Sequence, residues 1–208
     1  MTMRVLSHIF TGKMIVVYII LAYLLGSIPV GVVLSKMKGQ DPRKTGSGNI
    51  GATNVMRTAG KGLGILTLAG DILKGLLPTW LAIHYDQPAV IIAACGLAAF
   101  AGHLWPIYLR FKGGKGVATA LGLFLALKPA VIPILLAVFI VVLLKWRYVS
   151  LGSLVGTALM PLLLLLFGSP VEYIVVSLVV GLLIYYKHRD NIKRLLSGTE
   201  HKFRGTVA

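Results

Sequence analysis

Acidic residues, cysteines and charged side chains in general are scarce in this sequence of 208 residues. It has 6 Asp and Glu against 21 Lys and Arg, and only 13% of its residues are charged. Because Mg²⁺ sites in enzymes need several carboxylates, we expect no paired-carboxylate site, no two-metal site and no other bound metal. The single cysteine, Cys95, lies in an apolar run and excludes a disulfide framework and a thiolate metal site. No cofactor is expected either.

Three catalytic signatures are also missing. None of the histidines is followed five positions later by aspartate, as in the H-x-x-x-x-D acyltransferases. No G-x-S-x-G elbow and no G-x-x-x-x-G-K-[ST] nucleotide loop occurs. An enzyme built from this chain therefore needs a substrate that arrives already activated.

Hydrophobic residues are abundant instead, at 57% of the chain. A soluble domain would need far more polar surface, so the composition predicts an all-α, polytopic integral membrane protein. We expect a short N-terminal extension at 1–13 and a single membrane domain at 14–208. The chain has no separate basic domain that would bind nucleic acid. The apolar stretches lie at 14–35, 63–84, 89–109, 117–127, 130–144, 149–167 and 171–186.

The fourth stretch, 117–127, is too short for a helix to cross a bilayer core of about 30 Å unaided. Charge placement nevertheless indicates that it crosses. With seven crossings and the 36–62 loop in the cytoplasm, most Lys and Arg face inward, whereas six would put Lys145, Arg147 and the tail outside. We therefore predict seven transmembrane helices with a short fourth helix, the N-terminus outside and the C-terminus in the cytoplasm.

The stretch Phe111–Thr119, FKGGKGVAT, lies between two apolar stretches on the predicted cytoplasmic side. Its glycines, Gly113, Gly114 and Gly116, allow backbone N–H groups to turn inward together, and Lys115 adds a positive charge. Such a loop can hold a phosphate. Taken alone, the pattern fits a basic glycine turn between two helices at least as well.

The first cytoplasmic loop carries four short hydrogen-bonding side chains, Ser47, Asn49, Thr53 and Asn54, among glycines that permit tight turns. Arg57 follows them and can bind an anion through two parallel hydrogen bonds. A loop of this composition can bind polyol hydroxyls and a phosphate together. The alternative is a solvated linker.

Two ionisable residues, Asp71 and Lys74, stand three positions apart in the predicted second helix. Such a pair in a membrane segment is a functional candidate, and we favour mutual neutralisation and support of the loop. His103 lies at the inner end of the third apolar stretch, where loop anchoring is favoured over substrate contact. Ser153 lies about one turn into the sixth stretch and can face the site.

The C-terminal tail places His188, Asn191 and Leu195 on one face of a predicted helix. His188 can relay a proton, and Asn191 can orient a hydroxyl group. The alternative is a basic amphipathic helix that lies on anionic lipid. The two roles are compatible, because opposite faces of the helix serve them.

Three segments of the chain resemble, in the same order, the motifs of the bacterial glycerol-3-phosphate acyltransferases that use acyl phosphate, the PlsY family. The segments are GSGNIGATNVMR, GHLWPIYLRFKGGKGVATALG and HRDNIKRLLSGTE. The resemblance covers nearly the whole chain. It implies a seven-helix enzyme of the bacterial inner membrane whose active site faces the cytoplasm. It also implies acyl transfer from acyl phosphate to the sn-1 hydroxyl of glycerol 3-phosphate, the first acylation of phospholipid synthesis, which yields lysophosphatidic acid and phosphate.

The resemblance also implies roles for individual residues. Ser47 and Arg57 match an important serine and arginine of the first motif, and Gly113–Gly116 matches the phosphate-binding loop. His188 and Asn191 match a functional pair of the third motif. Glu200 matches a glutamate of structural importance, and Ser153 matches a serine that contacts substrate.

Some questions stay open at the level of the sequence. The base is either His188 or the phosphate of the donor, with the donor favoured, and Lys115 can hold the phosphate of either substrate. Acyl phosphate, glycerol 3-phosphate and membrane lipid are the expected partners, and a monomer is expected. The rival functions are a transporter of anionic solutes, which the lack of internal repeats disfavours, and an enzyme acting on another activated lipid.

Overall fold

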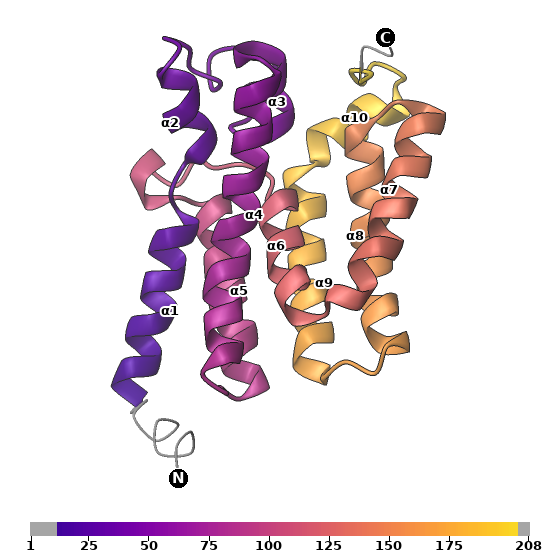
Figure 1. Ribbon diagram of the computed structural model, residues 1–208. Helices are drawn as coiled ribbons and strands as arrows, with labels where there is room; N and C mark the ends of the chain where they lie inside the picture. The colour runs from indigo at the N-terminus through magenta and orange to yellow at the C-terminus, as the bar shows by residue number, and fades with distance from the viewer. Residues whose placement is uncertain (1–11, 204–208) are drawn as a thin grey trace. The chain divides into compact units, whose positions relative to one another are not determined.

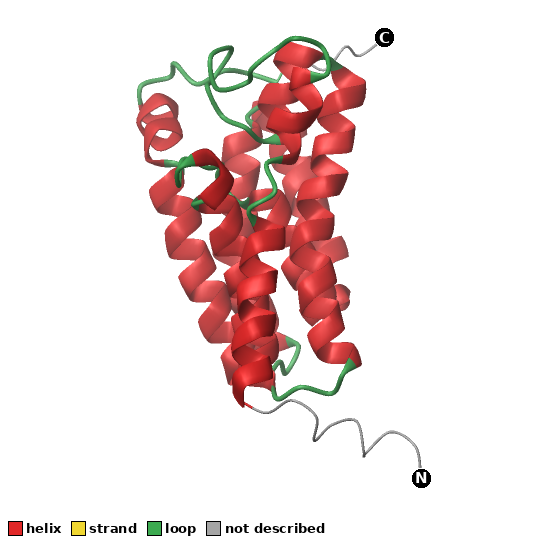
Figure 2. Cartoon of the chain, turned by 90° about the vertical axis from the view of Figure 1, so that its left-hand side faces the viewer, coloured by secondary structure: helices red, strands yellow, loops and turns green. Residues whose placement is uncertain are grey.

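Every regular element that the computed structural model describes, across residues 12–203, is a helix (Figure 2). The predicted all-α class is therefore confirmed for these residues. Helices satisfy their own backbone hydrogen bonds, which is the condition for a chain that spans hydrocarbon. The predicted extension at 1–13 lies outside the described residues, except for its last two positions at the start of the first helix.

The chain divides into two compact units, described here over residues 12–127 and 128–203 (Figure 1). Unit 1 contains α1 (Gly12–Gly26), α2 (Val30–Lys36), α3 (Ala52–Ala59), α4 (Lys61–His84), α5 (Ala89–Leu104), the 3₁₀ turn η2 (Ile107–Leu109) and α6 (Val117–Leu127). Unit 2 contains η3 (Pro129–Val131), α7 (Ile132–Trp146), α8 (Val149–Leu166), α9 (Val171–Lys187) and α10 (Arg189–Leu196).

Among the described residues, 5 helical stretches are long and apolar enough to cross a membrane. They are Met14–Lys36, Lys61–His84, Ala89–Leu109, Pro129–Trp146 and Val149–Leu166. A sixth candidate is the pair α9 and α10, which is bent by 61°. The short fourth stretch forms α6 with the predicted bounds and has 11 residues.

The first apolar stretch, predicted as one transmembrane helix, is a single candidate span but is broken into α1 and α2. The interruption falls at Ser27–Pro29, between α1 and α2. Pro29 has no backbone N–H to donate, which favours a helix break at this position. A second difference lies in the polar first loop, where residues 52–59 form the helix α3.

Helices α4 and α6 of unit 1 approach each other closely through glycine. A Cβ on Gly75 of α4 would overlap the carbonyl oxygen of Thr119 on α6. A Cβ on Gly122 of α6 would in turn overlap the carbonyl oxygen of Ile72 on α4. Small residues let membrane helices pack backbone against backbone, so the start of α6 is fixed against α4.

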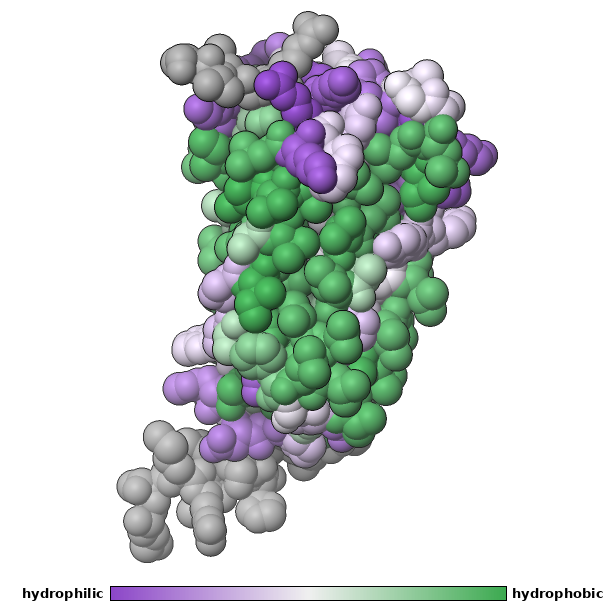
Figure 3. All heavy atoms as spheres, turned by 90° about the vertical axis from the view of Figure 1, so that its right-hand side faces the viewer, coloured by the Kyte–Doolittle hydropathy of each residue, from purple (hydrophilic) through white to green (hydrophobic). Residues whose placement is uncertain are grey.

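The surface of unit 2 is apolar along its helices. Leu144, Leu166 and Leu182, one from each of α7, α8 and α9, are all more than two-thirds exposed. The face of this unit shown in Figure 3 is hydrophobic over most of the helix length, with hydrophilic residues near the helix ends. Exposed leucines at this density are expected where lipid replaces water as the solvent.

Candidate functional site

The segment Phe111–Gly116, called here the glycine-lysine loop, follows η2 through a tight turn and leads directly into α6. Arg110 and Phe111 take left-handed φ angles of 52° and 62°, and Gly116 follows with a φ of 85°. The N–H of Gly114 donates to the carbonyl oxygen of His103 at 3.1 Å. The first N–H groups of α6 follow Gly116, so a lysine and a helix N-terminus adjoin the same loop, an arrangement that favours anions.

The first loop is built around the buried side chain of Asn54 on α3. Its Nδ2 donates to the carbonyl oxygens of Pro42, Thr45 and Asn49 at 2.9, 3.1 and 2.9 Å. Its Oδ1 accepts the N–H of Ser47 at 2.8 Å. The amide of Asn54 is therefore committed to the loop backbone, which it holds in a fixed curve. The sequence pattern indicated Asn54 as a candidate for substrate binding and gave no sign of this central position.

The remaining candidate side chains of this loop face outward. Ser47, Thr53 and Arg57 are exposed, and Asn49 is half-buried. The only acidic neighbour within the loop sequence is Asp41, whose carboxylate binds Arg43 at 2.6 Å. The hydrogen bond from the Arg43 side chain lowers the pKa of Asp41 to about 2. The negative charge of Asp41 is thus offset by Arg43. The loop presents Arg57 and several polar groups to a ligand.

A buried charge cluster lies in the helices of the same unit. The Lys74 Nζ is 2.8 Å from Asp71 Oδ1, which confirms the predicted ion pair. The Nδ1 of His103 on α5 is 3.6 Å from the same carboxylate oxygen. All three side chains are buried. The pairing offsets the cost of burying each charge, which is high inside a membrane.

In unit 2 the carboxylate of Glu200 collects three hydrogen bonds. Ser150 and Asn191 donate to its Oε1 at 2.9 and 2.6 Å, and Arg194 donates to its Oε2 at 2.7 Å. Burial alone would raise the pKa of Glu200, but these bonds together outweigh it and the pKa is lowered. The carboxylate therefore ties the tail to α8 and α10. Sequence reasoning assigned Glu200 a structural role but missed its partners Ser150 and Arg194.

His188 stands at the junction of α9 and α10 and is only 3% exposed. Its Nδ1 lies 2.9 Å from the carbonyl oxygen of Ile184. A carbonyl can only accept, so Nδ1 carries hydrogen and the neutral ring keeps its basic lone pair on Nε2. Ser153 of α8 is also buried, and its hydroxyl donates to the carbonyl oxygen of Val149 at 2.9 Å.

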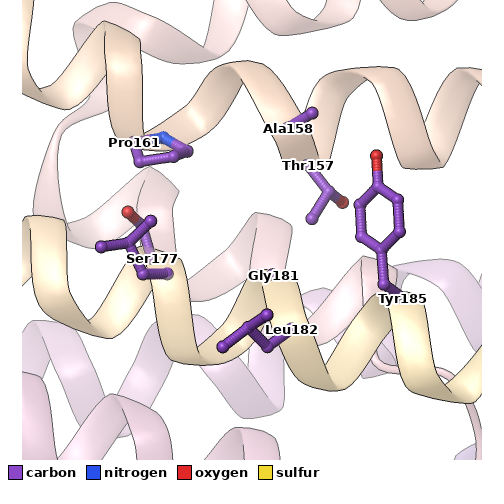
Figure 4. A pocket seen from close by; sticks show the side chains of 8 residues that line it. Thr157, Ala158, Pro161, Ser177, Gly181, Leu182 and Tyr185 are labelled. Carbon is purple, nitrogen blue, oxygen red and sulfur yellow. The ribbon is translucent and has the colours of Figure 1, made fainter.

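A groove of about 190 Å³ lies between α8 and α9 within unit 2 (Figure 4). Gly181 and Thr157 leave it open, and the Tyr185 hydroxyl donates to the carbonyl oxygen of Leu154 at 3.1 Å. The lining is almost entirely apolar. The rest of the lining is Ala158, Pro161, Ser177, Leu178 and Leu182.

The structure brings several predicted residues into direct contact: Asp71 with Lys74, Ser47 with Asn54, and Asn191 with Glu200. The region 12–203 contains no group of three or more His, Cys, Asp or Glu side chains with the arrangement of a metal site. What the described chain offers is a set of basic and polar loops at the ends of apolar helices.

These features define an integral membrane protein with a candidate anion-binding loop, and comparison with known proteins gives the family. Residues 16–198 match the family described as glycerol-3-phosphate acyltransferase. A glycerol-3-phosphate acyltransferase of Geotalea daltonii is 53% identical over 91% of this chain and 97% of its own length. One of Trichlorobacter lovleyi is 51% identical over 88% of this chain and 94% of its own length.

A solved structure agrees with these relatives. It is a crystal structure of PlsY, an integral membrane glycerol 3-phosphate acyltransferase, in its glycerol 3-phosphate form. It shares 45% identity with this chain, covers 93% of this chain and 96% of its own, and superposes with a TM-score of 0.89. The chain belongs to the glycerol-3-phosphate acyltransferase family, as the motif resemblance indicated.

Proposed function

We propose that this protein transfers a fatty acyl group from acyl phosphate to the sn-1 hydroxyl of glycerol 3-phosphate. Lysophosphatidic acid and inorganic phosphate are the products. Family membership supports the acceptor, and the solved relative has both a glycerol 3-phosphate form and a lysophosphatidic acid form. The observation that carries the proposal is the glycine-lysine loop, held against His103 and opening directly into α6.

The donor is proposed from chemistry. In acyl transfer the hydroxyl oxygen of the acceptor forms a bond to the carbonyl carbon of the donor, and the bond from that carbon to the leaving oxygen breaks. The sequence has no G-x-S-x-G nucleophile and no H-x-x-x-x-D pair to accelerate attack on a less reactive donor. Acyl phosphate is a mixed anhydride with a good leaving group, so positioning and charge stabilisation are sufficient for the reaction.

In unit 1 we assign Arg57 and Lys115 to the stabilisation of phosphate charge and of the oxyanion that develops on the acyl carbonyl. Gly113–Gly116 supplies backbone N–H groups to a phosphate. The exposed Ser47 and Thr53 and the half-buried Asn49 offer hydrogen bonds to glycerol hydroxyls. Asn54 contributes by holding the first loop in its curve.

In unit 2 we assign Asn191 and Ser153 to substrate contact through the third motif and α8, following the motif resemblance. Glu200 orients Asn191 through the 2.6 Å hydrogen bond. His188 is buried and bonded to Ile184, which favours an orienting role for its ring. We therefore favour the donor phosphate as the base: the hydroxyl proton passes to a phosphate oxygen, and hydrogen phosphate leaves.

The topology belongs to the same proposal. Seven crossings, with the N-terminus outside, place the first loop, the glycine-lysine loop and the tail in the cytoplasm of a bacterial inner membrane. The excess of Lys and Arg in these segments supports this orientation by the positive-inside rule. Water-soluble glycerol 3-phosphate and membrane-embedded acyl chains can then meet at the cytoplasmic surface. A monomer is the proposed working unit.

The test uses purified protein in detergent or vesicles with glycerol 3-phosphate and either acyl phosphate or acyl-CoA. We expect lysophosphatidate with acyl phosphate only. Product with acyl-CoA alone would contradict the donor assignment, and no product with either would refute the function. Uptake of labelled glycerol 3-phosphate into protein-containing vesicles without product would favour the rival transporter.

Lys115→Met and Lys112→Met form a matched pair of variants for the phosphate loop. Both remove one positive charge, but Lys112 is exposed ahead of the glycines, whereas Lys115 lies half-buried among them. We expect kcat/KM to fall about 100-fold or more for Lys115→Met, as for the loss of a charge-stabilising donor, and little for Lys112→Met. Equal losses in both variants would show that only bulk charge matters.

A further inference from the structure

The buried cluster of Asp71, Lys74 and His103 lies directly beneath the glycine-lysine loop. His103 is in the last turn of α5, and its carbonyl oxygen accepts the N–H of Gly114 at 3.1 Å. A Cβ on Gly114 would overlap the Nε2 atom of the His103 ring. One edge of this ring therefore lies against the loop, while its Nδ1 lies 3.6 Å from Asp71 Oδ1.

Gly113 contacts the same residue in a different way. A Cβ on Gly113 would overlap the backbone carbonyl oxygen of His103 rather than its ring. The loop thus rests on His103 through two neighbouring glycines, one against the side chain and one against the backbone. This difference allows the contribution of the ring to be measured separately from that of the chain path.

The other end of the cluster contacts the segment that leads to the first loop. The Lys74 Nζ donates to the carbonyl oxygen of Ile28 at 3.1 Å, inside the break between α1 and α2. That carbonyl precedes Pro29 and accepts the N–H of Val30 at 3.0 Å in place of the partner four residues on that it would have in an unbroken helix. In α2, a Cβ on Gly31 would overlap the carbonyl oxygen of Ile50 in the first loop. Lys74 therefore holds the base of α2, on which the first loop rests.

We propose that the Asp71–Lys74–His103 cluster is a positioning device that sets the glycine-lysine loop and the α2 segment in one geometry, with His103 as the positioning residue for phosphate binding. The inference rests on the proposed function. Asp71 is the shared partner: it holds Lys74 toward Ile28 and the His103 ring toward Gly114. The burial of all three side chains keeps water from replacing these contacts.

The first test replaces the ring nitrogens while keeping a ring. His103→Phe should raise the KM for glycerol 3-phosphate, acyl phosphate or both about tenfold or more, with a smaller change in kcat, because the loop is displaced before chemistry begins. His103→Gln, which keeps hydrogen-bonding groups, should recover part of the loss. The matched control is His84→Phe, the same exchange at an exposed histidine that stacks on Trp80. Unchanged KM values for both substrates in His103→Phe would overturn the proposal.

The second test measures coupling between the ring and the loop. Gly114→Ala should impair activity strongly in the wild-type background and less in a His103→Ala or His103→Gln background, where the smaller or more flexible side chain relieves the overlap. Gly113→Ala should be equally harmful in all three backgrounds, because its clash is with backbone. If the activity loss caused by Gly114→Ala is as independent of the residue at position 103 as the loss caused by Gly113→Ala, the proposal is overturned.

Failure of the proposed function is distinguishable from failure of this inference. If wild-type protein makes no lysophosphatidate, the proposed function fails, and inorganic phosphate serves as the probe of the loop. Phosphate should then raise the unfolding temperature of the wild type and of His84→Phe, but not that of His103→Phe. An equal rise in all three proteins, or none in the wild type, would overturn the inference.

Discussion

In unit 1, α4 and α6 meet through glycine and the charged pair Asp71–Lys74 is buried, whereas in unit 2 two glycines, Gly156 of α8 and Gly181 of α9, have space around them. Gly75 and Gly122 each face a backbone carbonyl that a methyl group would overlap. Gly156 has nothing within 4 Å of an added Cβ, and Gly181 has Thr157 at an ordinary 3.5 Å. The difference extends to the polar residues of the two units.

Unit 1 builds its polar contacts into the helix packing. Asp71 and Lys74 lie on α4 close to Gly75. Lys74 donates to the carbonyl oxygen of Ile28 between α1 and α2, and Asp71 lies beside His103, which contacts the glycine-lysine loop. In unit 2 the charged contacts lie at the helix ends instead, where the carboxylate of Glu200 ties the tail to Ser150 and Asn191. The contact between α4 and α6 in unit 1 should therefore tolerate change poorly, and the positions of Gly156 and Gly181 in unit 2 should tolerate it well.

The largest effect is expected where unit 1 is tightest. Gly75→Ala should destabilise the protein by about 3 kcal/mol, because the new methyl group meets a carbonyl on a rigid helix and forces α4 away from α6. Thermal unfolding in detergent, followed by circular dichroism, measures this. The same exchange at Gly156 in unit 2 is the control and should cause no loss. A comparable loss of stability in both variants would show that the two units do not differ in how tightly their helices pack at glycine.

Next in size is the central side chain of the first loop. Asn54→Asp keeps the shape but removes the Nδ2 donor of three hydrogen bonds, so it should cost about 2 kcal/mol and lower the activity. The exposed neighbour on the same helix, Thr53, provides the comparison, and Thr53→Ala should leave the unfolding temperature unchanged. If Asn54→Asp unfolds like the wild type, the loop does not depend on this amide.

A smaller effect is expected in unit 2 when the carboxylate at the tail is neutralised. Glu200→Gln retains one oxygen acceptor but weakens the charge-assisted bonds from Arg194 and Asn191, for about 1 kcal/mol at neutral pH. Because folding lowers the pKa of Glu200, its stabilisation is present above the unfolded value and is lost as pH falls through the folded value.

The difference in stability between wild type and Glu200→Gln should therefore begin to shrink as pH falls below about 4, where the unfolded carboxylate becomes protonated, and be smallest below the lowered folded pKa, where both states are protonated. Unfolding temperatures measured at several pH values test this. A difference that stays constant across the acidic range would mean that the charge of Glu200 contributes nothing beyond its shape.

The sequence predicted the parts of the fold that depend on local pattern. The bounds of α6 follow from an apolar run between the glycine-lysine loop and Lys128, and the pair Asp71–Lys74 follows from helical spacing. The motif resemblance likewise located both polar loops and the third motif, because these are continuous segments of chain.

The rest depends on contacts between distant segments. The bond from Ser150 to Glu200 joins residues 50 positions apart, and no periodicity marks it. Helix α3 lies in a polar stretch, and its fully buried Val55 shows that packing against the rest of unit 1 stabilises it. The sequence favoured loop anchoring for His103, but it could not show that the ring lies against Gly114 and the carbonyl oxygen against Gly113.

The smallest effect is expected in the groove between α8 and α9. Gly181→Ala adds a methyl group at an ordinary contact distance from Thr157 and replaces the poorest of the non-proline helix formers by the best. We expect the unfolding temperature to stay the same or rise slightly. The corresponding gain in the free energy of unfolding should be less than about 1 kcal/mol. Since an alanine at Gly75 overlaps a carbonyl and one at Gly181 makes only an ordinary contact with Thr157, Gly75→Ala should lower the stability and Gly181→Ala should not. A loss at Gly181 as large as that at Gly75 would show that α8 and α9 close on each other as tightly as α4 and α6.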